Sequence, residues 1–390
     1  MTLHPCQIAA VSPVRMLNSG LTARGTGVKV LYSNSPESLK YRQNDLPSNP
    51  EIIATLDAGY YLAGGIPISG TPIRVYMYHL NNVGSDLEFL VMVGNSGTQT
   101  IDVVANGYGA DHSGNHFDNA QEAASNAWEW YLYRRGTEQV LFSVGPGEIA
   151  AAALTVPAGK VGVLIMELRA VNQADGSPAS DADLFLAAMQ ATIAGTTIVP
   201  APHQYTQQQV NFGGCSGTVP YGDIRFGQVV RGVWEVGDIH IPIDHVLGQN
   251  EYVEIGARAA CDPFGVPMVP GELLWGYDWT FGSGTQVWCY GSYPFLYRFD
   301  ITWRNTVSFE REGRTYLQLN PELSPESNYM FLTELSGASR AFSPICRVPA
   351  SASEGWPVHS VLVPANSSVV TRLETAIPGG GSGHVRLILV

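Results

Sequence analysis

Residues 70–109 constrain the fold of this chain more than any other stretch. Residues 73–80 and 87–93 are dense in Val, Ile, Leu, Tyr and Phe, and turn-forming Asn and Gly residues follow them at 81–84 and 94–97. Apolar runs of this length that are interrupted by Asn and Gly are typical of β-strands joined by tight turns. The stretch predicts a β-meander and places the chain in the all-β class.

One segment departs from this pattern and predicts a helix. Residues 119–135 are rich in Ala and Glu, Asp118 or Asn119 can cap the N-terminus, and Gly136 follows the end. The apolar side chains recur with i, i+3, i+4 spacing and form one helical face: Ala120, Ala123, Ala124, Ala127, Trp128, Tyr131 and Leu132. We expect this face to pack on a sheet edge or to seal one end of a sandwich. A second, shorter helix is expected at residues 180–190.

The length of 390 residues favours two domains, because single cores rarely exceed roughly 250–300 residues. A Pro-rich linker at residues 198–203 sets the predicted boundary. We therefore predict an N-terminal arm at 1–27, a β-sandwich domain with the inserted helix at 28–200, and a second, aromatic-rich β-sandwich or jelly-roll-like domain at 201–390.

A short phrase occurs once in each half of the chain. Residues 156–159 read VPAG and residues 363–366 read VPAN, each between an apolar run and a further predicted strand. The recurrence hints at two sandwiches of related design. A chance match in a chain rich in Pro and Gly explains the same letters.

The charge pattern restricts the classes of partner. Charged residues make up 14% of the chain, only three are lysines (Lys29, Lys40 and Lys160), and the net charge is −13. Protein interfaces are depleted in Lys and Glu and enriched in Tyr, Trp and Arg, so the 18 Tyr and 8 Trp residues suggest a surface covered by copies of the same chain. Replacement of Lys by Arg in a GC-rich genome is the alternative. The acidic balance argues against nucleic acid and anionic membranes as partners.

No apolar stretch reaches the roughly 18–20 residues of a membrane span, and the N-terminus lacks the features of a standard signal peptide.

The five cysteines are Cys6, Cys215, Cys261, Cys289 and Cys346, and none forms a CxxC pair. In an oxidising environment the last four could form two disulfides within a domain and leave Cys6 for pairing between chains. Five reduced, buried cysteines are the alternative.

One loop collects residue types that bind metals. Asp111, His112, His116 and Asp118 could converge on Zn, Mn or Fe. A polar loop that caps the following helix explains the same residues, and we therefore predict no metal and no cofactor.

Two further sets of residues are candidates for a metal site and for a catalytic site. His240 and His245 lie on or beside an alternating strand, with His245 expected on a turn, and could bind a metal as in cupins. The carboxylates of Glu251, Glu254, Asp278 and Glu310 could serve a glycosidase in an aromatic cleft. That cleft would be formed by Trp275, Trp279 and Trp288, which could alternatively stack on sugars without catalysis or pack in a core or an interface.

Residues 31–37 (LYSNSPE), 74–82 (RVYMYHLNN) and 89–91 (FLV), with Asn95, resemble uncharacterised β-sandwich regions of Gram-positive bacterial surface proteins that accompany stalk domains. The resemblance covers roughly residues 28–170 and implies an extracellular structural part without catalytic residues. The arm that carries Cys6 is also similar in architecture to that of spore-appendage proteins.

Together these features predict a self-assembling structural protein rather than an enzyme. We expect a filament, a spore or surface appendage, or a coat, located outside the cell or on its surface and held by contacts between copies and by the N-terminal arm. A virion capsid protein fits the same features. A carbohydrate-binding or metal-dependent β-sandwich enzyme is the competing class, with a glycan as its ligand.

Overall fold

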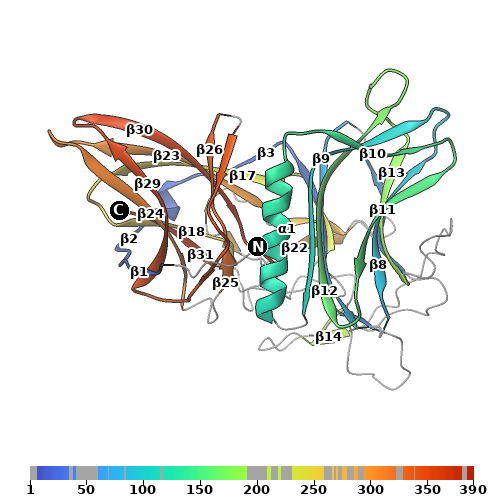
Figure 1. Ribbon diagram of the computed structural model, residues 1–390, viewed down its shortest axis with the longest axis horizontal. Helices are drawn as coiled ribbons and strands as arrows, with labels where there is room; N and C mark the ends of the chain where they lie inside the picture. Colours follow the sequence, from blue (N-terminus) through green and yellow to red (C-terminus); the bar gives the residue numbers. More distant parts are fainter. Residues whose placement is uncertain are drawn as a thin grey trace. The chain divides into compact units, whose positions relative to one another are not determined.

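The computed structural model describes residues 7–34, 38–40, 60–68, 70–82, 85–114, 117–190, 209–211, 218–220, 231–258, 266–267, 269–270, 275–278, 285–288, 294–321, 328–337, 339–379 and 384–390. These residues are mainly β-strands and include one α-helix, so the predicted all-β sandwich class with a single helix is confirmed (Figure 1). The chain forms two compact units. Unit 1 consists of Met1–Thr26, Val236–Leu274 and Cys289–Val390, and unit 2 consists of Gly27–Glu235 and Trp275–Trp288. The linker predicted at 198–203 lies outside the described residues.

Unit 2 is built on a jelly roll of eight consecutive strands. The strands are β6 (Tyr60–Pro67), β7 (Ile73–Asn82), β8 (Leu87–Asn95), β9 (Ile101–Gly114), β10 (Gln139–Val144), β11 (Ile149–Val156), β12 (Lys160–Asn172) and β13 (Ala182–Gln190). They pair from the inside outward, β9 with β10, β8 with β11, β7 with β12 and β6 with β13. Successive pairs alternate between two sheets, ordered β10-β9-β12-β7 and β11-β8-β13-β6, which is the jelly-roll arrangement.

Further strands extend the larger sheet of unit 2. β4 (Lys29–Ser33) and β5 (Ser38–Lys40) run parallel to β7, and β16 (Arg231–Trp234), β21 (Trp275–Asp278) and β22 (Thr285–Trp288) continue the sheet beyond β4. β14 (Gln209–Asn211) and β15 (Thr218–Pro220) pair separately.

Unit 1 repeats the same nested pairing with strands that are less evenly spaced in sequence. They are β18 (Glu251–Ile255), β23 (Leu296–Asn305), β24 (Arg311–Leu319), β26 (Thr333–Ser336), β27 (Ser339–Phe342), β29 (Glu354–Val363), β30 (Ser367–Ala376) and β31 (Val385–Leu389). β26 pairs with β27, β24 with β29, β23 with β30, and β18 with β31. The two sheets have the orders β27-β26-β30-β23 and β29-β24-β31-β18, so strand for strand the topology matches that of unit 2.

The remaining strands of unit 1 lie at its edges. β17 (Asp238–Val246) runs parallel to β23, as β4 does to β7 in unit 2. The N-terminal segment supplies β1 (Ala9–Ala10) beside β29, β2 (Arg15–Met16) beside β18 and β3 (Arg24–Thr26) beside β17. A 3₁₀ turn, Asn18–Gly20, separates β2 from β3. The pairs β19 (Ala257–Arg258) with β20 (Val266–Pro267) and β25 (Asn328–Met330) with β28 (Cys346–Val348) complete the unit.

The meander predicted at residues 70–109 is wrong, although its strands are present. β7 and β9 lie in one sheet of unit 2 and β8 lies in the other, so β8 pairs with neither β7 nor β9. Local sequence locates strands and turns, whereas the partner of each strand is decided by contacts far away in sequence.

The predicted helix is confirmed as α1 (Phe117–Arg134), and all seven residues of its predicted apolar face are buried. It covers the outer face of the larger sheet of unit 2, along β9 and β12 (Figure 1). β7 is therefore buried on both sides, with Ile73, Val75 and Met77 in the core between the sheets and Tyr76 against Trp128 of the helix. This burial explains the dense apolar character of its sequence.

Glycines in β9 allow α1 to touch the backbone of the sheet. A Cβ atom on Gly109 would lie 1.8 Å from the carbonyl oxygen of Ala127, and one on Gly107 would lie 2.9 Å from that of Tyr131. Gly107 also has a φ of 106°, which disfavours any other residue. The small side chains of the helix and these glycines together set the distance between helix and sheet.

Buried asparagines hold equivalent turns in both units. At the end of β7, the Asn81 Nδ2 donates to the carbonyl oxygens of Ser85 (2.8 Å) and Val156 (2.8 Å). At the end of β23, the Asn305 Nδ2 donates to those of Phe309 (2.7 Å) and Val363 (3.0 Å).

The two acceptors Val156 and Val363 are the first residues of the VPAG and VPAN phrases. In each unit the phrase connects the strands that pair with those flanking the asparagine, β11 with β12 and β29 with β30. The recurrence noted in the sequence therefore marks the same structural position in two related jelly rolls.

The helix predicted at residues 180–190 is wrong, because the segment forms β13. Leu184, Leu186 and Ala188 alternate into the core of unit 2, and β13 pairs with both β6 and β8. A period of two suits a strand, and a short apolar segment cannot be assigned from composition alone.

Replacement of Gly109 by Ala is expected to destabilise unit 2 by about 3 kcal/mol, because the new methyl group collides with backbone atoms that cannot move aside. Gly94→Ala in β8 is the matched control, since its Cβ would meet Phe185 at an ordinary 3.4 Å. Urea unfolding followed by tryptophan fluorescence measures both changes. Equal stability of the two variants would contradict the close seating of α1.

Asn81→Ala and Asn305→Ala are each expected to cost about 1–3 kcal/mol, because carbonyl groups at buried turns lose their donor. The neighbouring Asn82 is exposed, so Asn82→Ala serves as the control for Asn81→Ala. Thermal unfolding of the variants measures the difference. A loss at Asn82 as large as at Asn81 would show that the bridge to Val156 is unimportant.

Candidate functional site

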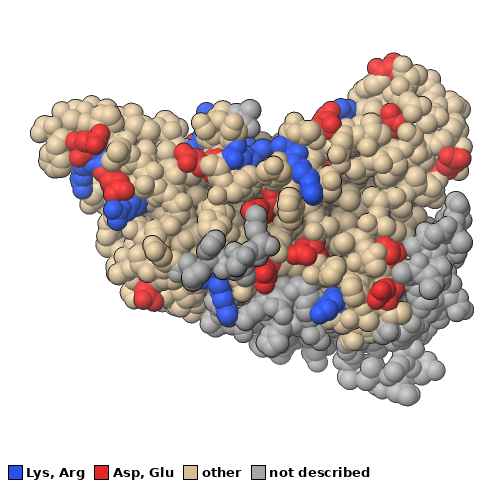
Figure 2. All heavy atoms as spheres, in the orientation of Figure 1, with Lys and Arg blue, Asp and Glu red and all other residues tan. Residues whose placement is uncertain are grey.

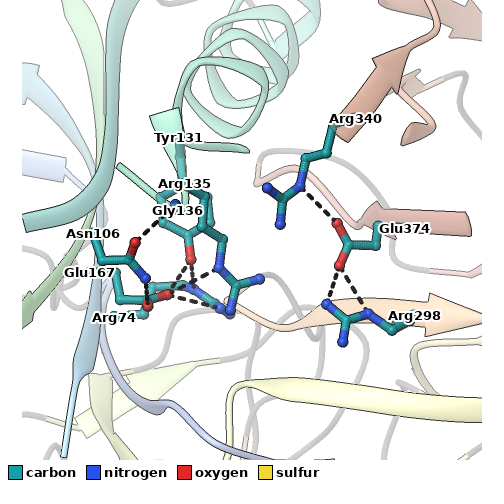
Figure 3. A network of polar contacts seen from close by, with 9 residues as sticks. All are labelled: Arg74, Asn106, Tyr131, Arg135, Gly136, Glu167, Arg298, Arg340 and Glu374. Atoms are coloured by element: carbon teal, nitrogen blue, oxygen red, sulfur yellow. Dashed lines mark hydrogen bonds and ion pairs between the residues drawn. The ribbon is translucent and has the colours of Figure 1, made fainter. Parts of the chain in front are cut away.

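A buried ionic cluster lies beneath α1 in unit 2 (Figure 3). The Glu167 carboxylate, on β12, accepts hydrogen bonds from the Tyr131 hydroxyl (2.5 Å) and the Asn106 Nδ2 (2.7 Å). It also pairs with the guanidinium groups of Arg74 (3.6 Å) and Arg135 (3.4 Å). The cluster therefore links β7, β9 and β12 to the C-terminal end of the helix.

Aromatic rings complete the surroundings of the Arg74 guanidinium. It donates from Nε to the Tyr131 hydroxyl (3.1 Å) and lies 5.5 Å from the Trp128 ring and 5.2 Å from the Tyr131 ring. Removal of one partner from a buried ion pair leaves an uncompensated charge, which costs roughly 3–5 kcal/mol. The cluster offers no nucleophile beside a base, and we assign it the role of fixing α1.

The opposite face of α1 carries an ordered group of aromatic residues that is open to solvent. Trp130 is 44% exposed and Tyr133 is 69% exposed, and their rings meet edge to face at 6.1 Å. The Arg134 guanidinium lies 4.1 Å from the Tyr108 ring and 4.8 Å from the Trp130 ring, and it donates to the Tyr108 carbonyl oxygen (3.0 Å). We call Trp130, Tyr133 and Arg134 the helix surface; Tyr108 belongs to β9, packs against the core of unit 2 and contacts this surface through Arg134.

The helix surface has the composition of a protein contact. Trp, Tyr and Arg dominate the binding energy of interfaces, and rigid stacking reduces the entropy lost when they bind. In the face of the molecule drawn in Figure 2, most of the surface carries no charged side chain, in line with the low charge content of the sequence.

Unit 1 holds a second ionic cluster, on the sheet that contains β23 and β30 (Figure 3). Glu374 is buried and accepts two hydrogen bonds from Arg298 (3.0 and 2.5 Å) and one from Arg340 (3.3 Å). Two arginines around one carboxylate form a structural network.

A buried histidine in unit 1 joins its two sheets. The His245 Nδ1, on β17, lies 2.8 Å from the Glu251 Oε2, on β18, and the other oxygen of Glu251 lies 3.2 Å from the Arg15 Nη1. The His245 ring packs edge to face against Trp303 at 5.2 Å. Burial lowers the pKa of His245, and the hydrogen bond and charge of Glu251 and the charge of Asp244 oppose this shift.

Asp111, one of the candidate metal ligands, has other contacts. The Asp111 carboxylate, on β9, accepts hydrogen bonds from the backbone N–H of His112 (2.8 Å) and the Asn126 Nδ2 of α1 (2.8 Å). The position of His116 and the side chain of Asp118 lie outside the description. In the part of the chain that the structure describes, no group of three or more His, Cys, Asp or Glu side chains could hold a metal ion.

The two candidate histidines lie on β17 of unit 1. His240 alternates with buried Ile239 and Ile241 as expected, and its Nε2 lies 2.8 Å from the Asp300 Oδ2. His245 was expected on a turn, and this is wrong, because it is a core residue of β17. The strand continues past Pro242 and returns each second side chain to the core.

The four carboxylates that are candidates for a glycosidase belong to several elements of both units. Glu251 and Glu254 are buried in β18 of unit 1, Glu310 lies in an exposed turn of unit 1, and Asp278 belongs to β21 of unit 2. Trp275 and Trp288 are directly opposite in the β21–β22 pair of unit 2, and Trp279 lies outside the described residues.

Among the cysteines, Cys346 is buried in β28, whereas Cys6, Cys215, Cys261 and Cys289 lie outside the description. Their pairing stays a prediction. By position in the chain, Cys215 belongs to unit 2 and the other four belong to unit 1.

Sequence reasoning missed the helix surface and the ionic cluster beneath it. Trp130 and Tyr133 fall outside the apolar face of the helix, and large aromatic residues on a predicted polar face are a usable signal of binding. Arg74 and Glu167 lie inside strands, where sequence alone does not indicate that they meet.

Among the described helices, none is long and apolar enough to cross a membrane.

Comparisons with known proteins add no functional assignment. No family model and no curated protein matches the chain. Among solved structures, it is similar to the CUB1-EGF-CUB2 domain of human MASP-1/3, with 11% identity and a TM-score of 0.17 over 85% of this chain and 97% of that chain.

Two further solved structures have similarly low identities and TM-scores. The CBM22 tandem domain of Paenibacillus barcinonensis Xyn10C has 9% identity and a TM-score of 0.17, over 100% of this chain and 97% of that chain. Lac15 from a marine microbial metagenome has 9% identity and a TM-score of 0.14, over 92% of this chain and 61% of that chain. At such TM-scores these similarities carry no argument.

Acidification is expected to destabilise unit 1 through His245. The pKa of His245 in the folded protein is lowered below the unfolded value of about 6.5. The free energy of unfolding of unit 1 therefore decreases as the pH falls from about 6.5 toward the folded pKa, with a limiting slope of about 1.4 kcal/mol per pH unit. His245→Gln keeps a donor for Glu251 and removes the titration. Urea unfolding between pH 7.5 and 5 should show a shallower loss for His245→Gln than for the parent, whereas the exposed His112→Gln should leave the slope unchanged. A parent-like slope in His245→Gln would contradict this assignment.

Proposed function

We propose that the chain is a structural subunit that assembles with copies of itself into a closed protein shell of the virion capsid type. The observation that carries the proposal is the presence of two jelly rolls with the same strand order in one chain. Jelly rolls are the building blocks of many viral capsids, and they also occur in lectins and cupins.

Two equivalent blocks in one chain suit a shell. A closed assembly needs rigid units that present the same contact surfaces repeatedly around symmetry axes. The nested strand pairs and the asparagine bridges hold each block in one shape, and a chain with two blocks supplies two related contact surfaces per copy. This arrangement supports a shell better than a single catalytic or ligand-binding role.

The surface chemistry supports contact between copies. The helix surface offers exposed Trp130 and Tyr133, and Phe309, Leu362 and Val370 are exposed large hydrophobic residues of unit 1. With only three lysines and 14% charged residues, few side chains resist desolvation when copies meet.

An open filament, an appendage or a coat at the cell or spore surface is the second candidate, because the same contacts give open assemblies when their symmetry does not close.

At the cell or spore surface, or in a secreted virion, we propose that Cys346 pairs with Cys261 or Cys289 within unit 1. Of the three remaining cysteines, Cys6 lies near the N-terminus and is the candidate for a link between chains. Tryptic peptide mapping without reductant identifies the pairs, and a fully reduced Cys346 would contradict this proposal.

A carbohydrate-binding or metal-dependent enzyme is less supported. Its candidate residues were His240, His245, Glu251, Glu254, Asp278 and Glu310, and the described ones have separate structural contacts or lie in different units. We therefore propose no catalytic role and no cofactor.

Purified chain at neutral pH and moderate salt is expected to form closed particles of uniform size by negative-stain electron microscopy and light scattering. Trp130→Ser with Tyr133→Ser should reduce particle yield about tenfold or more, because hot-spot aromatic residues are lost. Glu122 lies on the same helix more than two turns before Trp130, so Glu122→Gln serves as the control. Monodisperse single chains under all conditions would contradict the shell, and open filaments would favour the second candidate.

A further inference from the structure

The N-terminal segment, residues 7–26, crosses one face of unit 1, and we call it the arm. β1 lies beside β29 and β2 lies beside β18, which are opposite edges of the same jelly-roll sheet. The residues between them therefore pass over the outer face of that sheet. Val11 packs there with Tyr316 and Ile388 in an apolar cluster that is separate from the main core.

Polar contacts fix the arm at three further points. The Asn18 side chain donates to the Glu254 carbonyl oxygen (2.6 Å) and accepts from the Glu254 N–H (2.9 Å). Arg15 pairs with the buried Glu251 carboxylate (3.2 Å). The Ala23 N–H donates to the Pro270 carbonyl oxygen (2.7 Å), just before β3 joins the edge of the other sheet beside β17. The arm thus covers three sheet edges that would otherwise be open to pairing.

The arm and its docking face are far apart in sequence. Asn18 and Glu254 are 236 residues apart, and the chain passes through unit 2 between them. The arm leaves unit 1 at Gly25-Thr26-Gly27, where Gly27 has a φ of 74°. Only Gly27 and Val28 separate β3 from β4 of unit 2, so this short junction is the hinge at which the arm would turn to the docking face of another copy.

The docked arm carries exposed apolar side chains that suit contact with a neighbouring copy. Val14 is 78% exposed and Met16 is 43% exposed, so the arm itself carries two of the large exposed hydrophobic side chains of the described residues.

We propose that in the assembled state the arm of one chain docks on the β18–β31–β24–β29 face of a second copy and so links the subunits. The exchanged arm makes the same strand pairs, the same Asn18 contacts and the same Arg15–Glu251 ion pair that it makes within one chain. This inference rests on the proposed self-assembly, and the test separates the two.

Mixed cysteine variants test the exchange. Ala10 and Glu354 are directly opposite in the antiparallel β1–β29 pair, where Cα atoms are about 4.5–5.5 Å apart and a disulfide can form. One chain carries Ala10→Cys and the other carries Glu354→Cys, so neither can close this bond within itself. The two are mixed in equal amounts before assembly, oxidised mildly, and examined by non-reducing electrophoresis and peptide mass spectrometry.

The control mixture carries Glu312→Cys on one chain and Leu362→Cys on the other. These residues are opposite within the β24–β29 pair, which belongs to one jelly roll and does not exchange. The proposal predicts a covalent dimer linked through residues 10 and 354, with a yield about tenfold or more above the control. Assembled particles without that link would overturn the exchange and leave the shell intact. The linked dimer in a sample without particles would support the exchange and contradict the shell.

Discussion

The contact between α1 and the backbone of β9 is the constraint on which unit 2 depends. Gly107 and Gly109 leave no side chain between helix and sheet, and Ala127 approaches so closely that even a methyl group is excluded. The part of the larger sheet around β7, β9 and β12 is thereby buried on both faces, and Arg74, Tyr131 and Glu167 are enclosed as a network. The same rigid placement turns Trp130 and Tyr133 outward as an ordered surface.

Both units follow one design, and this likeness extends below the level of topology. Each has four nested strand pairs in alternating sheets, an added parallel strand beside β7 or β23, and a buried asparagine that bridges two turns. The chain therefore contains the same strand order at two places. That property suits repeated contact between copies, and it gives the shell hypothesis its physical basis.

The sequence predicted what local periodicity encodes. The strands at 73–80 and 87–93 and the apolar face of α1 were recovered, because burial imposes periods of two and 3.6 on neighbouring residues. The meander was wrong, since β7 pairs with β12 rather than β8, and such choices depend on residues far away in sequence. His245 and Glu251 were singled out as polar residues, but their burial against Trp303 and Arg15 follows from packing that no local pattern records.

The central claim is that two jelly rolls of one design build a closed assembly. A cryo-electron microscopy reconstruction of particles formed by the purified chain tests it most directly. We predict a closed shell in which each chain contributes two eight-stranded jelly rolls, with Trp130 and Tyr133 buried between copies. Particles in which these residues remain in solvent, or a protein that stays a single chain at every concentration, would contradict it.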